Sequence, residues 1–406
     1  MVATVAFWLT IGLLGWVYVG YPILVGTVSR LRPLRLDLTE PPSSLTVAIA
    51  VHDGESEIAD RIADVLGQDD GRVRIIEILV GSDGSTDRTD SIVGAIERND
   101  PRIRLLSLPR AGQSATQNAL LAASSGDILV LTDVETRYQA GCLAALAEVF
   151  RDPRVGCATG RLEWRNENAT ATSRNEGLYW RYERRLRELE SRAGFLAAVT
   201  GALLAVRRTA CRSVPASTSM DQVIPLYARE QGRTVMYVTD AVATDRPISG
   251  LREQFGNRAR TATQGIQANL SMVRRLTPWR HPTAALSIWS HKLARWATPW
   301  FVVGAAVSGL VLAIDGSTAY GVVPALTVLG LVLAAAGQAM TARGWRPPRP
   351  VAFCQAFTVV NLAFALAWVN VLRRRRFESW TSRPIARSPR VGLIDGGDGG
   401  RRNAAS

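Results

Sequence analysis

Long apolar stretches without charge lie near both ends of the chain. Residues 1–29 carry no charged side chain and 7–28 are mostly apolar, and the stretches 296–314, 316–342 and 351–372 are similar. A helix that crosses a bilayer needs ~20 such residues, because the hydrocarbon core is ~30 Å thick. The pattern predicts an N-terminal transmembrane anchor at 1–29 and a C-terminal membrane region at 296–372 with about three hydrophobic segments.

Each prediction has a simpler alternative. A cleavable signal peptide would explain the first stretch, but no basic residue precedes it and it is longer than a typical signal-peptide core. Buried core helices would explain the other three, but these stretches lack the polar face that a globular core helix shows. Membrane helices therefore remain the favoured interpretation.

The arginines beside these stretches bear on topology. Arg30, Arg32 and Arg35 directly follow the first stretch, which predicts that this end and the following domain are cytoplasmic. Three C-terminal crossings would then leave the basic tail, 373–406, outside, although four arginines at 373–376 favour the inside. Either one stretch is re-entrant or interfacial, or the charge rule is overridden. From residue 388 onward we expect disorder.

Between the apolar ends, residues 45–250 alternate between two periodicities. Short apolar runs typical of buried strands are 45–51, 74–80, 103–108 and 127–131, and helical spacing marks 58–66, 87–96, 114–123 and 143–150. This alternation predicts an α/β domain with a doubly wound, mainly parallel sheet. In such sheets ligands bind beyond the carboxyl ends of the strands.

Acidic side chains follow three of these strands. Asp53 follows the first and Asp83 the second, while Asp133 and Glu135 follow the fourth. Any one of them is ordinary turn or cap chemistry. Together they would repel one another at a single sheet edge, and a hard divalent cation or a hydrogen-bonded nucleoside would offset that repulsion.

Composition narrows the function classes. An apolar share of 47% with 20% charged residues excludes a disordered chain. The net charge of +13 suits nucleic acid, anionic lipid or phosphorylated substrates, but known nucleic-acid motifs are absent and the arginines cluster beside membrane segments. We expect a membrane partner and no nucleic acid. The four cysteines have no paired spacing, so neither a disulfide framework nor a zinc site is expected.

Two further helices carry both charged and aromatic residues. In 176–192, Tyr179, Trp180 and Tyr182 could stack on a sugar or lie at the membrane surface, but the simpler interpretation is a solvated helix with ion pairs such as Glu183–Arg187. Residues 251–276 form a basic amphipathic helix within a segment, 251–295, that is expected at the headgroup layer.

Five segments in order resemble the motifs of the family 2 glycosyltransferases, which have the GT-A fold. The resemblance covers about residues 45–260. The segments that carry it are VGSDGSTDRT (80–89), RAGQSATQNAL (110–120), LTDVET (131–136), VTGALLAVRRTA (199–210) and SMDQVIPL (219–226). Four positions depart from the family pattern, namely Gly54, Ser82, Gln113 and Met220.

The resemblance implies roles for the acidic turns. Asp83, and more weakly Asp53, would bind the nucleoside of a nucleotide sugar. Asp133 and Glu135 would hold Mg²⁺ or Mn²⁺, with Asp133 also facing the donor phosphates. Two carboxylates at i and i+2 after a strand can approach one hard cation, which fits this role.

The later segments would hold the acceptor and the base. Gly201 belongs to the loop that would close over the acceptor, and Asp221 would be the general base of an inverting transfer; the alternative is that Asp221 only caps a helix. Gln254 and Arg258 lie where processive members carry Q-x-x-R-W, so Gln254 would contact the acceptor and Arg258 the leaving diphosphate. Arginines bound only to lipid phosphate are the alternative.

The function expected from the resemblance is sugar transfer from a nucleotide-diphosphate donor, with UDP as a guess, to a lipid-linked or surface-polysaccharide acceptor. It would occur at the cytoplasmic face of a bacterial plasma membrane. No tryptophan follows Arg258 where Q-x-x-R-W has one, which argues against a cellulose- or chitin-type polymerase. A processive exopolysaccharide synthase and a degenerate, noncatalytic membrane scaffold stay open as alternatives.

Overall fold

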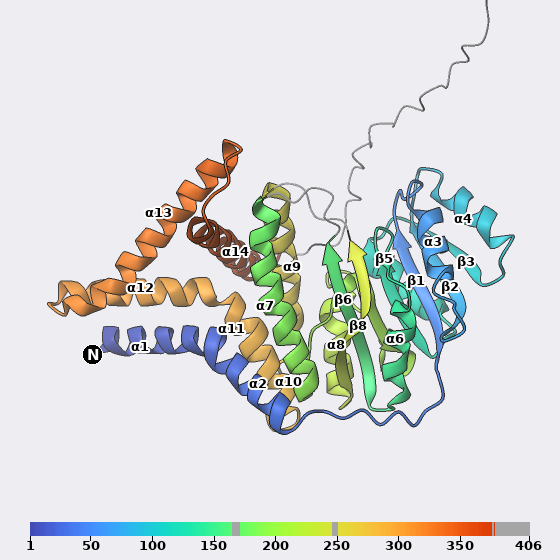
Figure 1. Ribbon diagram of the computed structural model, residues 1–406, viewed down its shortest axis with the longest axis horizontal. Coiled ribbons are helices and arrows are strands. Elements are labelled where there is room, and N and C mark those ends of the chain that lie inside the picture. The colour runs from blue at the N-terminus through green and yellow to red at the C-terminus, as the bar shows by residue number, and fades with distance from the viewer. Residues whose placement is uncertain (165–170, 246–250, 376, 378–406) are drawn as a thin grey trace, which may run out of the picture.

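The computed structural model describes residues 1–164, 171–245, 251–375 and 377, with only the backbone at 171–180 and 251–252. Figure 1 shows three adjoining parts: a sheet domain, a middle layer of helices and a set of apolar helices that project away from the domain. Most of the predicted tail, at 376 and 378–406, lies outside the described residues, as do the side chains of Tyr179 and Trp180.

One eight-stranded sheet forms the domain, in the order β3-β2-β1-β4-β7-β6-β8-β5. The first four strands are parallel to one another, β7 runs antiparallel between β4 and β6, and β8 is parallel to β6. The short β5 pairs antiparallel with β8. The mainly parallel α/β fold predicted from the sequence is therefore confirmed. The strands are β1 (Ser44–Val51), β2 (Arg74–Asp83), β3 (Ile103–Leu108), β4 (Ile128–Asp133), β5 (Arg137–Tyr138), β6 (Val155–Trp164), β7 (Leu204–Arg207) and β8 (Thr234–Asp245).

Helices cover both faces of the sheet because β1 is apolar on both. Its residues Leu45, Val47 and Ile49 pack into one core with α3, α4 and α6, whereas Ala48 and Ala50 face a second core with α5 and α8. The predicted helices lie within about three residues of the observed ones. The observed helices are α3 (Ile58–Leu66), α4 (Thr89–Glu97), α5 (Gln113–Ala123), α6 (Cys142–Glu148) and α8 (Met220–Glu230), with 3-10 turns at Val149–Arg151, Gly201–Leu203 and Arg208–Ala210.

The middle layer buries more polar surface than the sequence suggested. α7 packs against α2, and its Glu183 and Glu190 are buried beside His291, so the solvated helix predicted for this segment is wrong on these buried faces. The predicted Glu183–Arg187 ion pair is present at 3.1 Å. The layer consists of α7 (Ala171–Ala193), α9 (Leu251–Met272), α10 (Pro282–Ser287), a π turn (Ile288–Leu293), α11 (Ala294–Trp296) and α14 (Arg349–Leu372).

The apolar face of α9 is covered by protein. Ala262 and Ile266 pack with Phe364 and Ala367 of α14, and Leu226 of α8 joins the same cluster. The amphipathic pattern of this segment thus reflects helix–helix packing. The apolar face of α9, which the sequence predicted to contact the lipid headgroup layer, packs against α14.

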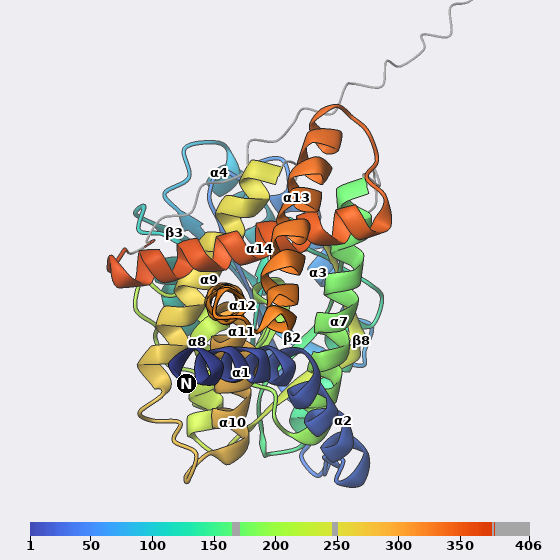
Figure 2. The same cartoon turned by 90° about the vertical axis from the view of Figure 1, so that its left-hand side faces the viewer.

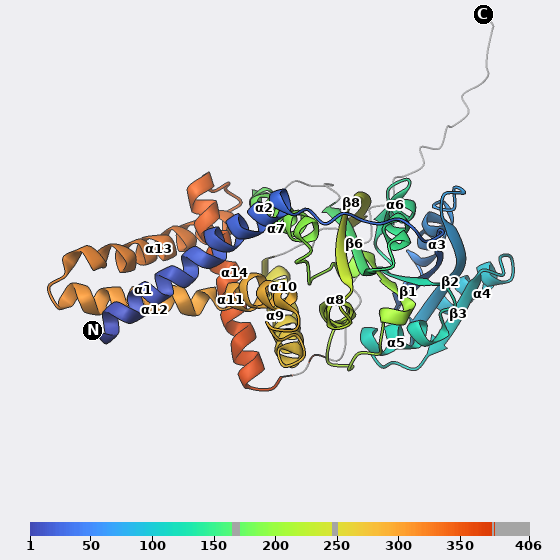
Figure 3. The same ribbon diagram turned by 90° about the horizontal axis from the view of Figure 1, so that it is seen from below.

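Three helices of the described chain are long and apolar enough to cross a membrane: Val2–Leu31, Thr318–Ala342 and Arg349–Leu372. A fourth candidate is the pair Pro282–Trp296 and Thr298–Ile314, bent by 61°. Figures 2 and 3 show α14 lying across α12, while α1 and α12 project side by side from the domain. The named elements are α1 (Val2–Gly15), a π turn (Trp16–Gly20), α2 (Tyr21–Leu31), α12 (Thr298–Ile314), a 3-10 turn (Thr318–Gly321) and α13 (Val322–Ala342).

Candidate active site

The turns after β1 and β2 are joined by hydrogen bonds. Asp53 has a φ of 50°, and its Oδ1 accepts a bond of 2.8 Å from the Thr86 backbone N–H. His52 Nδ1 lies 3.0 Å from the Asp83 carbonyl oxygen. The two predicted nucleoside-binding residues therefore stand on neighbouring, mutually supported turns.

Asp83 is completely buried, and its carboxylate already has protein donors. Its Oδ1 accepts bonds of 2.7 Å from Ala111 N–H and 3.1 Å from Gly112 N–H, and the Arg110 guanidinium donates to Oδ2 at 2.8 Å. Asp83 thus positions the turn that begins α5, where Gly112 takes a φ of 94°. Its nucleoside contact stays a prediction.

Four carboxylates gather around the end of β4. The pKa of Asp133 is raised from 3.8 to about 7, first by burial and then by the charges of Asp245, Glu135 and Asp221. Asp133 itself is half-buried. Asp245 ends β8 and was not predicted as a site residue, although an acidic residue at the end of an apolar run is the same signal that marked Asp133.

Asp221 lies in the first turn of α8, directly against the predicted acceptor loop. The Ser219 hydroxyl donates to its Oδ1, and Gln222 Nε2 donates to Oδ2 at 3.1 Å. A methyl group placed on Gly201 would lie 3.5 Å from the Asp221 carboxylate, so loop and base are neighbours. The Thr132 hydroxyl, one residue before Asp133, donates to Ala202 O at 2.9 Å and ties the same loop to β4.

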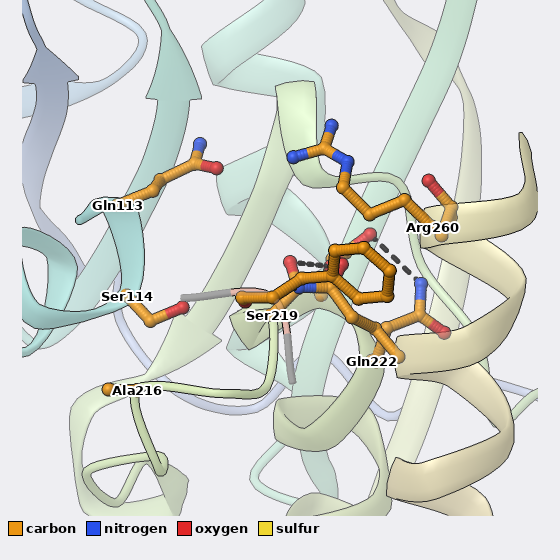
Figure 4. A pocket seen from close by; sticks show the side chains of 10 residues that line it. Gln113, Ser114, Ala216, Ser219, Gln222 and Arg260 are labelled. Carbon is orange, nitrogen blue, oxygen red and sulfur yellow. Dashed lines mark hydrogen bonds between the residues drawn. The ribbon is translucent and has the colours of Figure 1, made fainter. Parts of the chain in front are cut away.

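A pocket opens beside Asp221 (Figure 4). Its walls come from the start of α5, the turn before α8, the middle of α9 and the chain after α14, and they are Gln113, Ser114, Ala216, Ser219, Asp221, Gln222, Arg260, Thr261, Gln264 and Phe377. Gln113 Nε2 donates to Asp133 Oδ1 at 3.2 Å, so this wall reaches the carboxylate cluster. Arg260 and Phe377 were not expected from the sequence.

Gln254 and Arg258 stand on α9, half-buried, before the part of the helix that lines the pocket. Residues 254, 258 and 261 follow helical spacing of four and three, which places them on one face. Thr261 on that face lines the pocket. This placement is compatible with the predicted contacts of Gln254 with the acceptor and of Arg258 with the diphosphate. Both contacts remain predictions.

The comparison with protein families agrees with the predicted resemblance. The model of "Glycosyl transferase family 2" matches residues 46–214. These residues form a family 2 glycosyltransferase domain.

Curated relatives of the chain include several rhizobial proteins. An N-acetylglucosaminyltransferase of Bradyrhizobium diazoefficiens is 24% identical over 326 residues, covering 75% of this chain and 66% of the relative. Another from Rhizobium meliloti is 28% identical over 198 residues, covering 44% of the chain and 46% of the relative. The chain thus spans roughly half to two thirds of the length of these relatives.

A solved structure extends the fold comparison beyond the glycosyltransferase domain. The mannosyltransferase PcManGT from Pyrobaculum calidifontis, in complex with GDP-Man and Mn2+, matches with a TM-score of 0.68 at 21% identity. The match covers 91% of this chain and 100% of that chain. At this identity the likeness shows the shared GT-A fold with its attached helices.

The carboxylates around the end of β4 have the donor chemistry of a divalent-cation site. Across the residues that the structure describes, no three His, Cys, Asp or Glu side chains are arranged to hold a metal at once. The raised pKa of Asp133, due to burial and then to three carboxylates, nevertheless marks a spot where a cation would remove repulsion. Carboxylate oxygens are also the donors that Mg²⁺ and Mn²⁺ prefer.

Behind the cluster, a buried arginine supports β4. Arg61 of α3 is completely buried, donates to the Thr132 hydroxyl at 2.7 Å and stacks over the Tyr138 ring at 4.0 Å. It pairs with Asp64 on the same helix. Arg61 was not predicted from the sequence, because helical periodicity assigns no role to a single charged residue among the apolar positions of α3.

Proposed function

We propose that this protein is an inverting glycosyltransferase that moves a sugar from a nucleotide-diphosphate donor to a lipid-linked or surface-polysaccharide acceptor. The observation that carries the proposal is the convergence of Asp133, Glu135, Asp245 and Asp221 beside the Gly201 loop. Four like charges around one partly buried position disfavour folding by themselves, so a ligand is the simplest reason for the arrangement. The family 2 assignment of residues 46–214 supports the same reaction.

Each group has a distinct task in this reaction. Asp133 and Glu135 would hold Mg²⁺ or Mn²⁺, which supplies charge neutralisation for the leaving diphosphate. Asp221 accepts the proton of the acceptor hydroxyl as that oxygen bonds to the anomeric carbon. A single base that acts opposite the leaving group inverts the configuration there. Asp53 and Asp83 are the proposed nucleoside side of the site, and Arg258 adds positive charge near the diphosphate.

The donor can be tested directly. Relatives bear the name N-acetylglucosaminyltransferase, and PcManGT was solved with GDP-Man and Mn2+, so UDP-N-acetylglucosamine and GDP-mannose head the panel. The full chain in detergent or vesicles would be given labelled nucleotide sugars with and without Mn²⁺. We expect sugar transfer from one of them, only with the cation. A single added sugar supports simple transfer, a ladder supports a processive synthase, and no turnover of any donor supports a noncatalytic scaffold.

We further propose that the chain crosses the membrane at the N-terminal helix Val2–Leu31, at α12 and at α13, while α14 lies in the membrane plane on the domain side. α14 lies across α12 and packs on α9 and α7 of the middle layer. The 17 residues of α12 span ~26 Å, which a slightly thinned bilayer accommodates. The buried polar residues before the 61° bend suit a headgroup-level position for α10 and α11.

The loop charges agree with this topology. The segments on the domain side carry arginines at 30, 32, 35, 343, 346, 349 and 373–375. The connection between α12 and α13 at the far end contains only Asp315 as a charged residue. The arrangement satisfies the positive-inside rule with the domain and the tail in the cytoplasm. It also removes the conflict that three C-terminal crossings would create for the tail.

Cysteine labelling would check this topology. Single cysteines at Ser317, Arg374 and Arg98, all exposed, would replace the native residues in a background without Cys211 and Cys354. With a membrane-impermeant maleimide, we expect Arg374→Cys and Arg98→Cys to react from one side and Ser317→Cys from the other. Reaction of Arg374→Cys and Ser317→Cys from the same side would show instead that α14 crosses.

A further inference from the structure

A buried ionic network joins α7 to the helix pair that enters the apolar bundle. His291 lies between two carboxylates, with Nδ1 2.9 Å from Glu190 and Nε2 3.2 Å from Glu183. The Arg295 guanidinium donates to Glu183 Oε2 at 2.6 Å. Glu183 is buried, which raises its pKa, yet the charges of His291 and Arg295, with that of Lys292, hold the pKa well below its usual value. Glu183 is therefore a fixed anion at the boundary between the domain and the bundle.

Arg187 extends this network toward the active site. Its Nε donates to Glu183 Oε1 at 3.1 Å, and its Nη1 donates to the Thr200 hydroxyl at 2.8 Å. The Arg187 side chain is only 13% exposed, so both bonds lie largely away from water. One guanidinium thus holds the buried anion and the loop at once, a use for which its planar, multiply donating geometry is suited.

Thr200 directly precedes Gly201, the residue that lies against Asp221. The Thr200 backbone N–H donates to the Thr159 hydroxyl at 3.1 Å, and that hydroxyl donates to Leu203 O at 2.8 Å. The acceptor loop is therefore held from β6 and β4 on the sheet side and from Arg187 on the α7 side. Without the Arg187 bond, the loop keeps its supports from the sheet but loses the support from α7 at Thr200, directly before Gly201.

We propose that Arg187 is a positioning residue for sugar transfer, which holds Thr200 and hence the Gly201 loop against Asp221 through the buried Glu183 network of the bent helix pair. The proposal rests on the proposed glycosyltransferase function. It links the seating of residues 282–296 on α7 to the geometry of the acceptor side, while the donor side, built on β1, β2 and β4, stays untouched. Loss of the Arg187 side chain should therefore lower the rate of transfer to the acceptor more than the rate at which the donor is hydrolysed.

The test uses vesicles that contain the full chain, with labelled UDP-N-acetylglucosamine or whichever donor the panel identifies. Incorporation into membrane material and release of free sugar to water are measured together. Arg187→Met is expected to lower incorporation ~10- to 100-fold, as loop misplacement of about 1 Å does, and to leave free-sugar release and the donor KM nearly unchanged. Arg187→Lys, which keeps a donor, should recover much of the incorporation, and Thr200→Val should resemble Arg187→Met.

Arg185→Met is the matched control, because Arg185 lies on the same helix, is exposed and forms an ion pair with Glu188 one turn further along that helix. It should behave like the unmodified protein. Equal effects of Arg187→Met and Arg185→Met, or an equal fall of incorporation and free-sugar release, would overturn the proposal.

Hydrogen exchange tests the same idea without activity. The amides of residues 199–204 should exchange faster in Arg187→Met than in Arg185→Met, and unchanged exchange there would refute the positioning role. If the unmodified protein turned over no donor, the proposed function would be wrong. The hydrogen-exchange result would then still test whether Arg187 holds the loop.

Discussion

Replacing Asp221 by asparagine is expected to lower sugar transfer ~10²- to 10⁴-fold, the usual contribution of a positioned general base. Asparagine keeps the size of the side chain and can still bond to Ser219 and Gln222, which contact the carboxylate now. The donor KM and the dependence on Mn²⁺ should change little, because Asp133 and Glu135 are intact. The measurement is the initial rate of sugar transfer by the full chain in vesicles, with the donor that the panel identifies.

Asp240→Asn serves as the control for Asp221→Asn, since Asp240 is an exposed carboxylate on β8 outside the pocket. We expect it to keep full activity. If Asp221→Asn retained more than about a tenth of the rate, the base would have to be another group, and Asp221 would be only a first-turn residue of α8.

Replacing Asp133 by asparagine is expected to abolish metal-dependent transfer and, in the absence of metal, to stabilise the fold at pH 8. The folded-state pKa of Asp133 is about 7 against 3.8 ordinarily, so ionisation disfavours the folded state. The stability tied to protonated Asp133 is present below about pH 4 and is lost as the pH rises through about 7. Asparagine carries no charge and escapes that loss.

Thermal unfolding of the full chain in detergent, with EDTA or with Mn²⁺, checks this expectation. With EDTA, Asp133→Asn should melt a few degrees above the unmodified protein at pH 8, and the gap should narrow toward pH 5. Mn²⁺ should raise the melting temperature of the unmodified protein and leave that of Asp133→Asn in place. If Mn²⁺ still raised the melting temperature of Asp133→Asn, the cation would bind at another site.

Much of the fold of the glycosyltransferase domain could be predicted from local sequence patterns. Strands β1 to β4 and the helices between them follow from local periodicity, since each buries a continuous apolar surface that its own residues define. The carboxylates Asp53, Asp83, Asp133 and Glu135 were visible for a related reason: parallel topology brings the ends of successive strands to one edge. Family resemblance of short segments then supplied their expected chemistry.

Other members of the site depended on distant contacts. Asp245 reaches the cluster only because β8 pairs with β6, and Arg260 and Phe377 reach the pocket only because α9 and α14 pack together. Periodicity within a segment carries no information about such pairings.

The amino-acid sequence by itself determined that this is an α/β domain with apolar helices at its ends and a row of acids after its strands, because those features depend on residues near one another in the chain. Only the tertiary structure decided that α14 lies across the bundle and that Arg187 links a buried anion to the acceptor loop. Both depend on which helices pack together, and packing is settled by the summed burial of surfaces far apart in sequence.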